Sequence, residues 1–154
     1  MTLEYGRDGV TPDIDAVASH QAVFEEAGRL GAEHGLPENW INSNAGGWVP
    51  PRPMWARRRP TQLGLTIHIA PAEHVLAMKL IAQRRKDRPD IRLLIKRCGM
   101  VDATAEEYAD FLDRIYSGED QLAQMLEVGS DPTDVRREAV AIGEWAHRFA
   151  ADLR

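Results

Sequence analysis

The sequence of 154 residues is 44% hydrophobic and carries a formal net charge of −5. This length suits one domain with its own core, no apolar run is long enough to span a membrane, and the first residues lack the pattern of a signal peptide, so a cytoplasmic protein is expected. The single cysteine, Cys98, excludes an internal disulfide and a zinc site built from several cysteines.

Charge is distributed unevenly along the chain. Between Arg52 and Arg97 there are twelve lysines and arginines against three acidic residues, whereas the flanking segments hold seven basic and twenty-one acidic residues. A protein of this kind can attract a polyanion to one surface. A solvated basic face balanced by acidic neighbours explains the same pattern, and the sequence leaves both interpretations open.

The first predicted elements are a short extended segment and a helix. The stretch "GVTPDIDAV", residues 9–17, carries Asp13 and Asp15 two positions apart. A helix is predicted after it, with Ser19 as its N-cap, apolar residues at helical spacing on one face, and Gly35 as its end.

A long irregular segment separates this helix from the rest of the chain. Residues 36–60 are dense in proline, glycine and asparagine, which predicts a loop with at most a short strand near Trp48 and Val49. The stretch "LGLTIHIA", residues 63–70, is predicted to be a strand because it is rich in β-branched residues.

The remainder is predicted to be helical. Thr104 with Glu107 forms a capping-box pattern, and Asp131 followed by Pro132 is a typical helix start. The sequence therefore predicts an α+β fold, with a small mixed sheet in a part spanning residues 1–70 and helices in a part spanning 71–154, the two forming one domain. The predicted helices cover residues 71–83, 90–97, 104–116, 120–128 and 132–149.

Asp13 and Asp15 form a candidate metal site. On a strand, residues two apart point to the same face, and two adjacent carboxylates raise each other's pKa unless a cation lies between them. Mg²⁺ prefers hard oxygen ligands and is commonly held by one or two carboxylates together with substrate phosphates. Asp-x-Asp after a proline is also typical of turns, where aspartate bonds to backbone groups. The spacing leaves both interpretations open.

Lys79 lies on a predicted helix that is apolar on nearly all sides, between the positions of Val75 and Leu76. Such a lysine either extends its ammonium group into solvent or directs it to an anion. The anion would be a phosphate or a pair of carboxylates.

The stretch "RRKDRPDIRLLIKR", residues 84–97, follows. Asp87 is in position to cap the next helix, and Asp90 is favoured in its first turn by the helix dipole, which explains both acids without catalysis. The basic residues are left unexplained, and they cluster near a helix start, where backbone N–H groups also favour anions. They include Lys86, Arg88, Arg92 and Lys96.

A second basic group lies on the long loop. Arg57, Arg58 and Arg59 follow Trp55, and an aromatic residue among arginines suits stacking on RNA bases. Trp55 as an anchor of the loop to the core is the alternative. The five histidines show no metal-ligand spacing and no serine lies in a Gly-x-Ser-x-Gly pattern, so neither zinc nor triad chemistry is indicated.

Three stretches, "GVTPDIDAV", "LPENWINSNAGGWVPP" and "APAEHVLAMKLIAQRRKDRPDIRLLIK", resemble the nucleotidyltransferase-like proteins of the abortive-infection AbiEii type, which occur in bacterial toxin–antitoxin and phage-defence loci. The resemblance covers about residues 1–97, and "LAMKLIAQRRKDRPDI" is its most specific part. It implies a DNA-polymerase-β-like nucleotidyltransferase fold and the transfer of a nucleotide from a nucleoside triphosphate to an acceptor, which is a tRNA, another RNA or a protein hydroxyl.

The resemblance also implies residue roles. Asp13 and Asp15 would bind Mg²⁺ carrying the triphosphate, Lys79 would approach the triphosphate, and Asp87 and Asp90 would orient it or the acceptor. The implied partners are the nucleotide, the acceptor and a cognate antitoxin. Further implied contacts are Thr11, Arg84, Lys86 and Arg88 for the nucleotide, and Arg57, Arg58 and Arg59 for the acceptor.

Two features depart from the family pattern. The family begins with a glycine-rich turn before the helix that leads into Asp-x-Asp, and residues 1–6 resemble that helix alone, which implies an N-terminal truncation relative to the family. A third carboxylate usually comes from a later strand, where this sequence has His68. A truncated start would expose a strand edge, which predicts a homodimer or a swapped N-terminus. The alternative function is a catalytically degenerate module that binds RNA or a partner protein through the basic middle segment.

Overall fold

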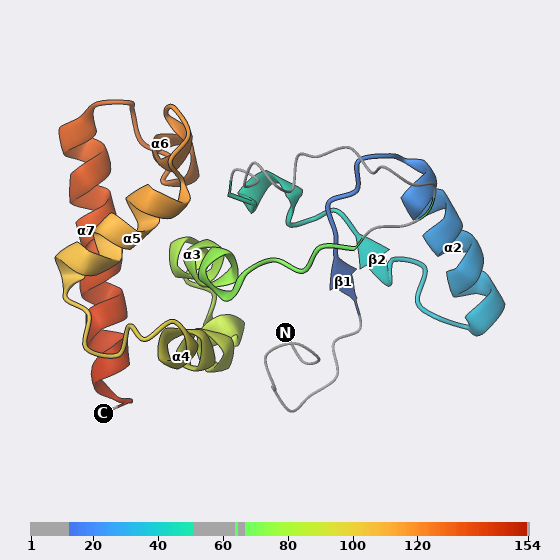
Figure 1. Cartoon of the computed structure of the whole chain (residues 1–154), viewed down its shortest axis with the longest axis horizontal. Coiled ribbons are helices and arrows are strands. Elements are labelled where there is room, and N and C mark those ends of the chain that lie inside the picture. Colours follow the sequence, from blue (N-terminus) through green and yellow to red (C-terminus); the bar gives the residue numbers. More distant parts are fainter. Residues whose placement is uncertain (1–12, 51–63, 65–66, 154) are drawn as a thin grey trace. The chain divides into compact units, whose positions relative to one another are not determined.

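The computed structural model describes residues 13–50, 64 and 67–153. The chain divides into two units, Met1–Val49 and Pro50–Arg154. The first contains a two-stranded sheet and the second contains only helices among its described residues, so the expected α+β composition, with a small sheet before a run of helices, is confirmed (Figure 1). No helix in the described part of the chain is both long and apolar enough to cross a membrane.

The first unit is built around two short parallel strands. Ile14 pairs with Ile41 and Asp15 pairs with Asn42. Parallel pairing requires a long connection between the strands, and a helix supplies most of it. The elements in chain order are β1 (Ile14–Asp15), α2 (Ala22–His34), β2 (Ile41–Asn42) and the 3₁₀ helix η1 (Gly46–Trp48).

The end of α2 agrees with the prediction and its start does not. Gly35 has φ of 66°, a left-handed conformation that glycine adopts without strain, and it ends the helix. Ser19 is not the N-cap: that position belongs to Gln21, which makes no side-chain capping bond. A tight turn explains the shift, because the carbonyl of His20 already accepts from the backbone N–H of Val23.

Trp40 attaches β2 to α2. Its indole Nε1 donates to the carbonyl of Ala27 at 2.9 Å. The ring also lies directly against Gly31, where a Cβ would come within 2.9 Å of the indole. The resulting contact fixes where β2 begins, and therefore the register with β1.

Two predicted strands are not observed. Gly46–Trp48 forms η1 rather than a strand near Trp48 and Val49, and the strand of this loop is β2 instead. Residues 67–70 form no strand, and Ile67 and Ile69 are 75% and 61% exposed. β-Branched residues favour strands mainly through packing against neighbours, which these side chains lack. Positions 63, 65 and 66 of this prediction lie outside the described residues.

The second unit is a helical bundle in which α5 and α7 pack along each other and α3 contacts α4, α5 and α7 (Figure 1). The centre of its core is formed by Leu76, Leu80, Ile91, Leu94 and Leu112, all with no exposed surface. Its elements are α3 (Ala72–Ala82), the 3₁₀ helix η3 (Arg85–Asp87), α4 (Arg88–Arg97), α5 (Ala105–Ile115), α6 (Gln121–Met125) and α7 (Pro132–Ala151).

The predicted starts of α5 and α7 are confirmed. The Thr104 hydroxyl accepts from the backbone N–H of Glu107, whose carboxylate accepts from the backbone N–H of Thr104 at 2.7 Å. Asp131 accepts from the N–H of Thr133 at 2.8 Å, and this bond lowers the pKa of its carboxyl group. These local bonds satisfy N–H groups that a helix start otherwise leaves without partners.

Gly143 allows α7 to approach α5 closely. A Cβ at this position would lie 2.1 Å from the carbonyl oxygen of Ala105, which is backbone and cannot rotate away. We expect Gly143→Ala to lower the free energy of unfolding by about 1–3 kcal/mol or more, although alanine is the better helix former by about 1 kcal/mol. Chemical unfolding followed by circular dichroism measures this change.

Gly28→Ala is the matched control, because Gly28 lies in α2 with no atom within 4 Å of its added Cβ. This substitution should stabilise the chain by up to about 1 kcal/mol. Equal effects of the two substitutions would contradict the close contact between α5 and α7.

Candidate functional site

Lys79 is held by two carboxylates inside the second unit. Its Nζ lies 2.5 Å from Asp87 Oδ1 and 2.9 Å from Asp90 Oδ2. Only 17% of the Lys79 side chain is exposed. Asp90 is the only buried charged residue in the part of the chain that the structure describes. Of the alternatives open for Lys79, a carboxylate pair at the end of its side chain is therefore the one observed.

The prediction that Asp87 caps the next helix is correct in position but wrong about the side-chain hydrogen bond. Asp87 does occupy the N-cap position of α4, and Asp90 lies in the first turn as expected, directly after Pro89. However, the Asp87 side chain makes no capping bond and binds the ammonium group of Lys79 instead. The full opposite charge of the Lys79 ammonium group attracts the carboxylate more strongly than a neutral N–H dipole does where both groups are poorly hydrated.

Asp87 and Asp90 reach the same ammonium group because of their spacing. Residues three apart lie on the same side of a helix, so both carboxylates at the start of α4 face α3. Charges this poorly hydrated are stable only when each has its partner. The cluster of Lys79, Asp87 and Asp90 therefore fixes the start of α4 against α3.

The outer side of the same segment carries only positive charge. Both acidic residues of the stretch 84–97, Asp87 and Asp90, are directed to Lys79. All seven basic residues of the stretch are exposed. They are Arg84, Arg85, Lys86, Arg88, Arg92, Lys96 and Arg97.

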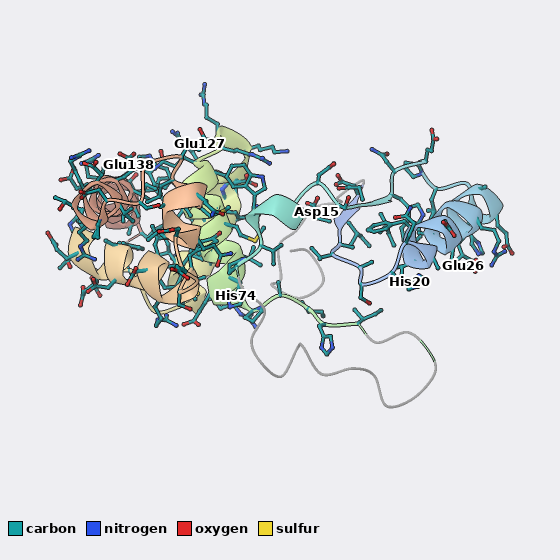
Figure 2. The ribbon with its side chains drawn as sticks, turned by 90° about the horizontal axis from the view of Figure 1, so that it is seen from above. Asp15, His20, Glu26, His74, Glu127 and Glu138 are labelled. Atoms are coloured by element: carbon teal, nitrogen blue, oxygen red, sulfur yellow. The ribbon has the colours of Figure 1, made fainter. Side chains whose placement is uncertain are left out.

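Asp13 and Asp15 lie at the start of the first unit's sheet, in extended backbone rather than in a turn. The backbone N–H of Ile14 donates to the carbonyl of Trp40, just before β2, and that of Ala16 donates to the carbonyl of Asn42 in β2, both at 2.7 Å. Asp15 is exposed on β1 (Figure 2). Asp13 is half-buried, and its Oδ2 accepts from the Asn42 side-chain amide at 3.3 Å.

Asn42 is a residue that sequence reasoning missed. It pairs with Asp15 in the ladder, while its amide reaches Asp13. No local pattern identifies it, because the pairing joins positions 29 residues apart and depends on the register of β1 and β2.

The predicted site residues thus fall into two groups. Asp13 and Asp15 belong to the first unit, and the cluster of Lys79, Asp87 and Asp90 belongs to the second. Their assembly into a single site stays a prediction. Arg84, Lys86 and Arg88 are exposed beside the second group. Thr11, Arg57, Arg58 and Arg59 lie outside the described residues.

His74, at the start of α3 (Figure 2), has its pKa lowered by burial, with Glu73 opposing the shift and Arg114 adding to it. The unfolded chain therefore binds this proton more readily, and stability is lost as pH falls below the ordinary histidine pKa of about 6.5. We expect His74→Gln to lose less stability than the wild type between about pH 7.5 and pH 5.5. Chemical unfolding at both values measures this, and equal losses would contradict it.

Comparison of the chain with protein-family models, with curated proteins and with solved structures finds no match.

Proposed function

We propose that this chain is a nucleotidyltransferase-like protein that transfers a nucleotide from a nucleoside triphosphate to an RNA such as tRNA, or to a protein, in a toxin–antitoxin or phage-defence setting. The observation that supports it most is the carboxylate pair at β1. Asp15 lies in β1 and Asp13 directly precedes the strand, with the intervening Ile14 paired to Ile41; alternate side chains of an extended segment share a face.

The donor set suits Mg²⁺. Within the described residues no group of three or more histidine, cysteine, aspartate or glutamate side chains could hold a metal, so Asp13 and Asp15 offer two carboxylates and no more. Mg²⁺ is commonly bound in this way, with waters and substrate phosphates completing its shell. The Asn42 amide holds one Asp13 oxygen, which limits the rotation of that carboxylate.

When bound, Mg²⁺ would neutralise charge on the phosphates of the triphosphate. The residues of the chain supply position and charge around it. Asp13 and Asp15 of the first unit would hold the metal. Lys79 of the second unit is the residue that the family resemblance assigns to the triphosphate, and two of its three N–H donors are directed to Asp87 and Asp90. To contact a triphosphate, Lys79 would use its third N–H donor, or a phosphate oxygen would replace one of the two carboxylates as its acceptor. Arg84 and Lys86, which the resemblance also assigns to the nucleotide, are exposed near Lys79 in the sequence of the second unit.

A binding module without catalysis is the second candidate. It is favoured by the charge of the stretch 84–97, whose exposed ionisable groups are all basic while Lys79 is already neutralised by its carboxylates. Such a surface suits RNA or an acidic partner protein and needs no metal.

Labelled transfer separates the two candidates. The chain is incubated with Mg²⁺, total tRNA and each of the four nucleoside triphosphates labelled at the α-phosphate. A transferase leaves label on the RNA or on protein after denaturing electrophoresis, and chelation of Mg²⁺ abolishes it. RNA retention without label from any of the four nucleotides would contradict transfer and support the binding module.

A further inference from the structure

One face of α4 carries a row of positive charge. Arg88, Arg92 and Lys96 are spaced four residues apart, so their side chains follow one another along the same side of the helix, and all three are exposed. Within the described part of the chain, Arg88 and Lys96 form no ion pair. Arg92 lies 3.9 Å from Asp152, and both side chains are at least half exposed.

The middle of this row meets an aromatic pair on α7. The guanidinium carbon of Arg92 lies 5.1 Å from the centre of the Phe149 ring. Phe149 in turn stacks on Trp145, with ring centres 5.1 Å apart and planes inclined by 10°. Both rings are half-buried, so they join the α7 surface to that of α4 and still reach solvent.

Packing between α4 and α7 alone would not require exposed basic residues next to a stacked aromatic pair. Aliphatic residues would fill the contact without exposed cations on either side of it. A positively charged track next to flat aromatic rings is instead the combination that proteins use for single-stranded nucleic acid, whose phosphates bind the cations and whose unpaired bases stack on the rings.

We propose that Arg88, Arg92 and Lys96 together with Trp145 and Phe149 form a surface that binds single-stranded nucleic acid, with at least one base stacked at the aromatic pair. Binding at this surface uses no metal and no triphosphate, so it is independent of the proposed transfer. If transfer occurs, this surface holds the acceptor, and that single assignment rests on the proposed function.

Substitutions that neutralise charge test the role of the basic row on α4. Fluorescence anisotropy of a labelled single-stranded RNA of about twelve nucleotides is measured without Mg²⁺ or nucleotide over a range of salt concentrations. Arg88→Gln/Lys96→Gln should weaken binding about ten-fold and reduce the slope of log affinity against log salt by about 1.4. The matched control is Arg136→Gln/Arg137→Gln, which removes two charges elsewhere on α7, from pairs with Asp110 and Asp134.

Loss of stacking tests the aromatic pair. Phe149→Leu should weaken single-stranded RNA binding about ten-fold and leave heparin, a polyanion without bases, unchanged. Single-stranded DNA and a duplex of the same sequence are compared, and the duplex should bind more weakly than either single strand. Circular dichroism confirms that each variant is folded.

Equal RNA affinity in the charge variant and its control would overturn the proposal. So would equal losses of RNA and heparin binding in Phe149→Leu, or a duplex that binds as tightly as the single strand. The absence of nucleotide transfer would leave these binding results unaffected, so the two proposals fail separately.

Discussion

Lys79→Met is expected to lower the free energy of unfolding by about 3–5 kcal/mol. The substitution keeps the length and apolar character of the side chain but leaves Asp87 and Asp90 without their shared cation. Asp90 is only 3% exposed, so water cannot replace the lost partner. Removing one member of a buried ion cluster carries a cost of this size because a charge is left uncompensated.

A compensating variant makes this prediction specific. In Lys79→Met/Asp87→Asn/Asp90→Asn the repelling charges are removed together, and most of the lost stability should return, because no uncompensated charge is left buried. Urea unfolding at neutral pH compares the three proteins. If Lys79→Met lowers the free energy of unfolding by less than about 1 kcal/mol, the ion pairs of Lys79 contribute no more than an exposed salt bridge, which would contradict the prediction.

Asp13→Asn/Asp15→Asn is expected to reduce nucleotide transfer at least about a thousand-fold. A catalytic metal lowers the barrier by several kcal/mol, and each 1.36 kcal/mol corresponds to a factor of about ten in rate. Asparagine has the size of aspartate and keeps the backbone pairing of β1 with β2, so the fold should persist. The initial rate of labelled transfer is the measurement.

Glu25→Gln/Glu38→Gln is the matched control for this variant. It removes two exposed carboxylates from the same unit, on α2 and on the loop that follows it. Its transfer rate should equal that of the wild type. Equal rates in both double variants and the wild type would remove the metal role from Asp13 and Asp15.

The helices that the sequence predicts correctly are those with strong local signals. Thr104 with Glu107 and Asp131 with Pro132 determine helix starts through bonds between near neighbours, which are legible in the sequence itself. Ser19 has the right residue type for a cap, yet a turn beginning at His20 shifts the helix start past it. Residue preference identified the helix but not its first residue.

The failed strand predictions have a different cause. Ile67 and Ile69 have high strand propensity but are exposed, so they lack the side-chain packing through which that propensity acts. Ile41 and Asn42 do form a strand although they lie in a loop-like stretch, because Ile14 and Asp15 pair with them. Pairing with a distant segment therefore decides where the observed strand of this loop forms.

The candidate site, too, could be predicted only where its signals are local in the sequence. The apolar surroundings of Lys79 indicated that its ammonium group needs an anion, but Asp87 and Asp90 already had a local explanation at a helix start, so the pairing between them became visible only in the structure. The contact of Arg92 with Phe149 was missed for a similar reason. Arg92 and Phe149 are 57 positions apart in the sequence. The only sequence signal was the spacing of four between the basic residues of α4 and between the two aromatic residues of α7.

Isothermal titration calorimetry with each nucleoside triphosphate tests the central claim, that Asp13 and Asp15 hold a metal-bound nucleotide, most directly. We predict that at least one triphosphate binds the wild type in the presence of Mg²⁺, that chelation of Mg²⁺ abolishes this heat, and that Asp13→Asn/Asp15→Asn does not bind. No binding of any of the four triphosphates with Mg²⁺, or equal binding by the wild type and the double variant, would contradict the claim.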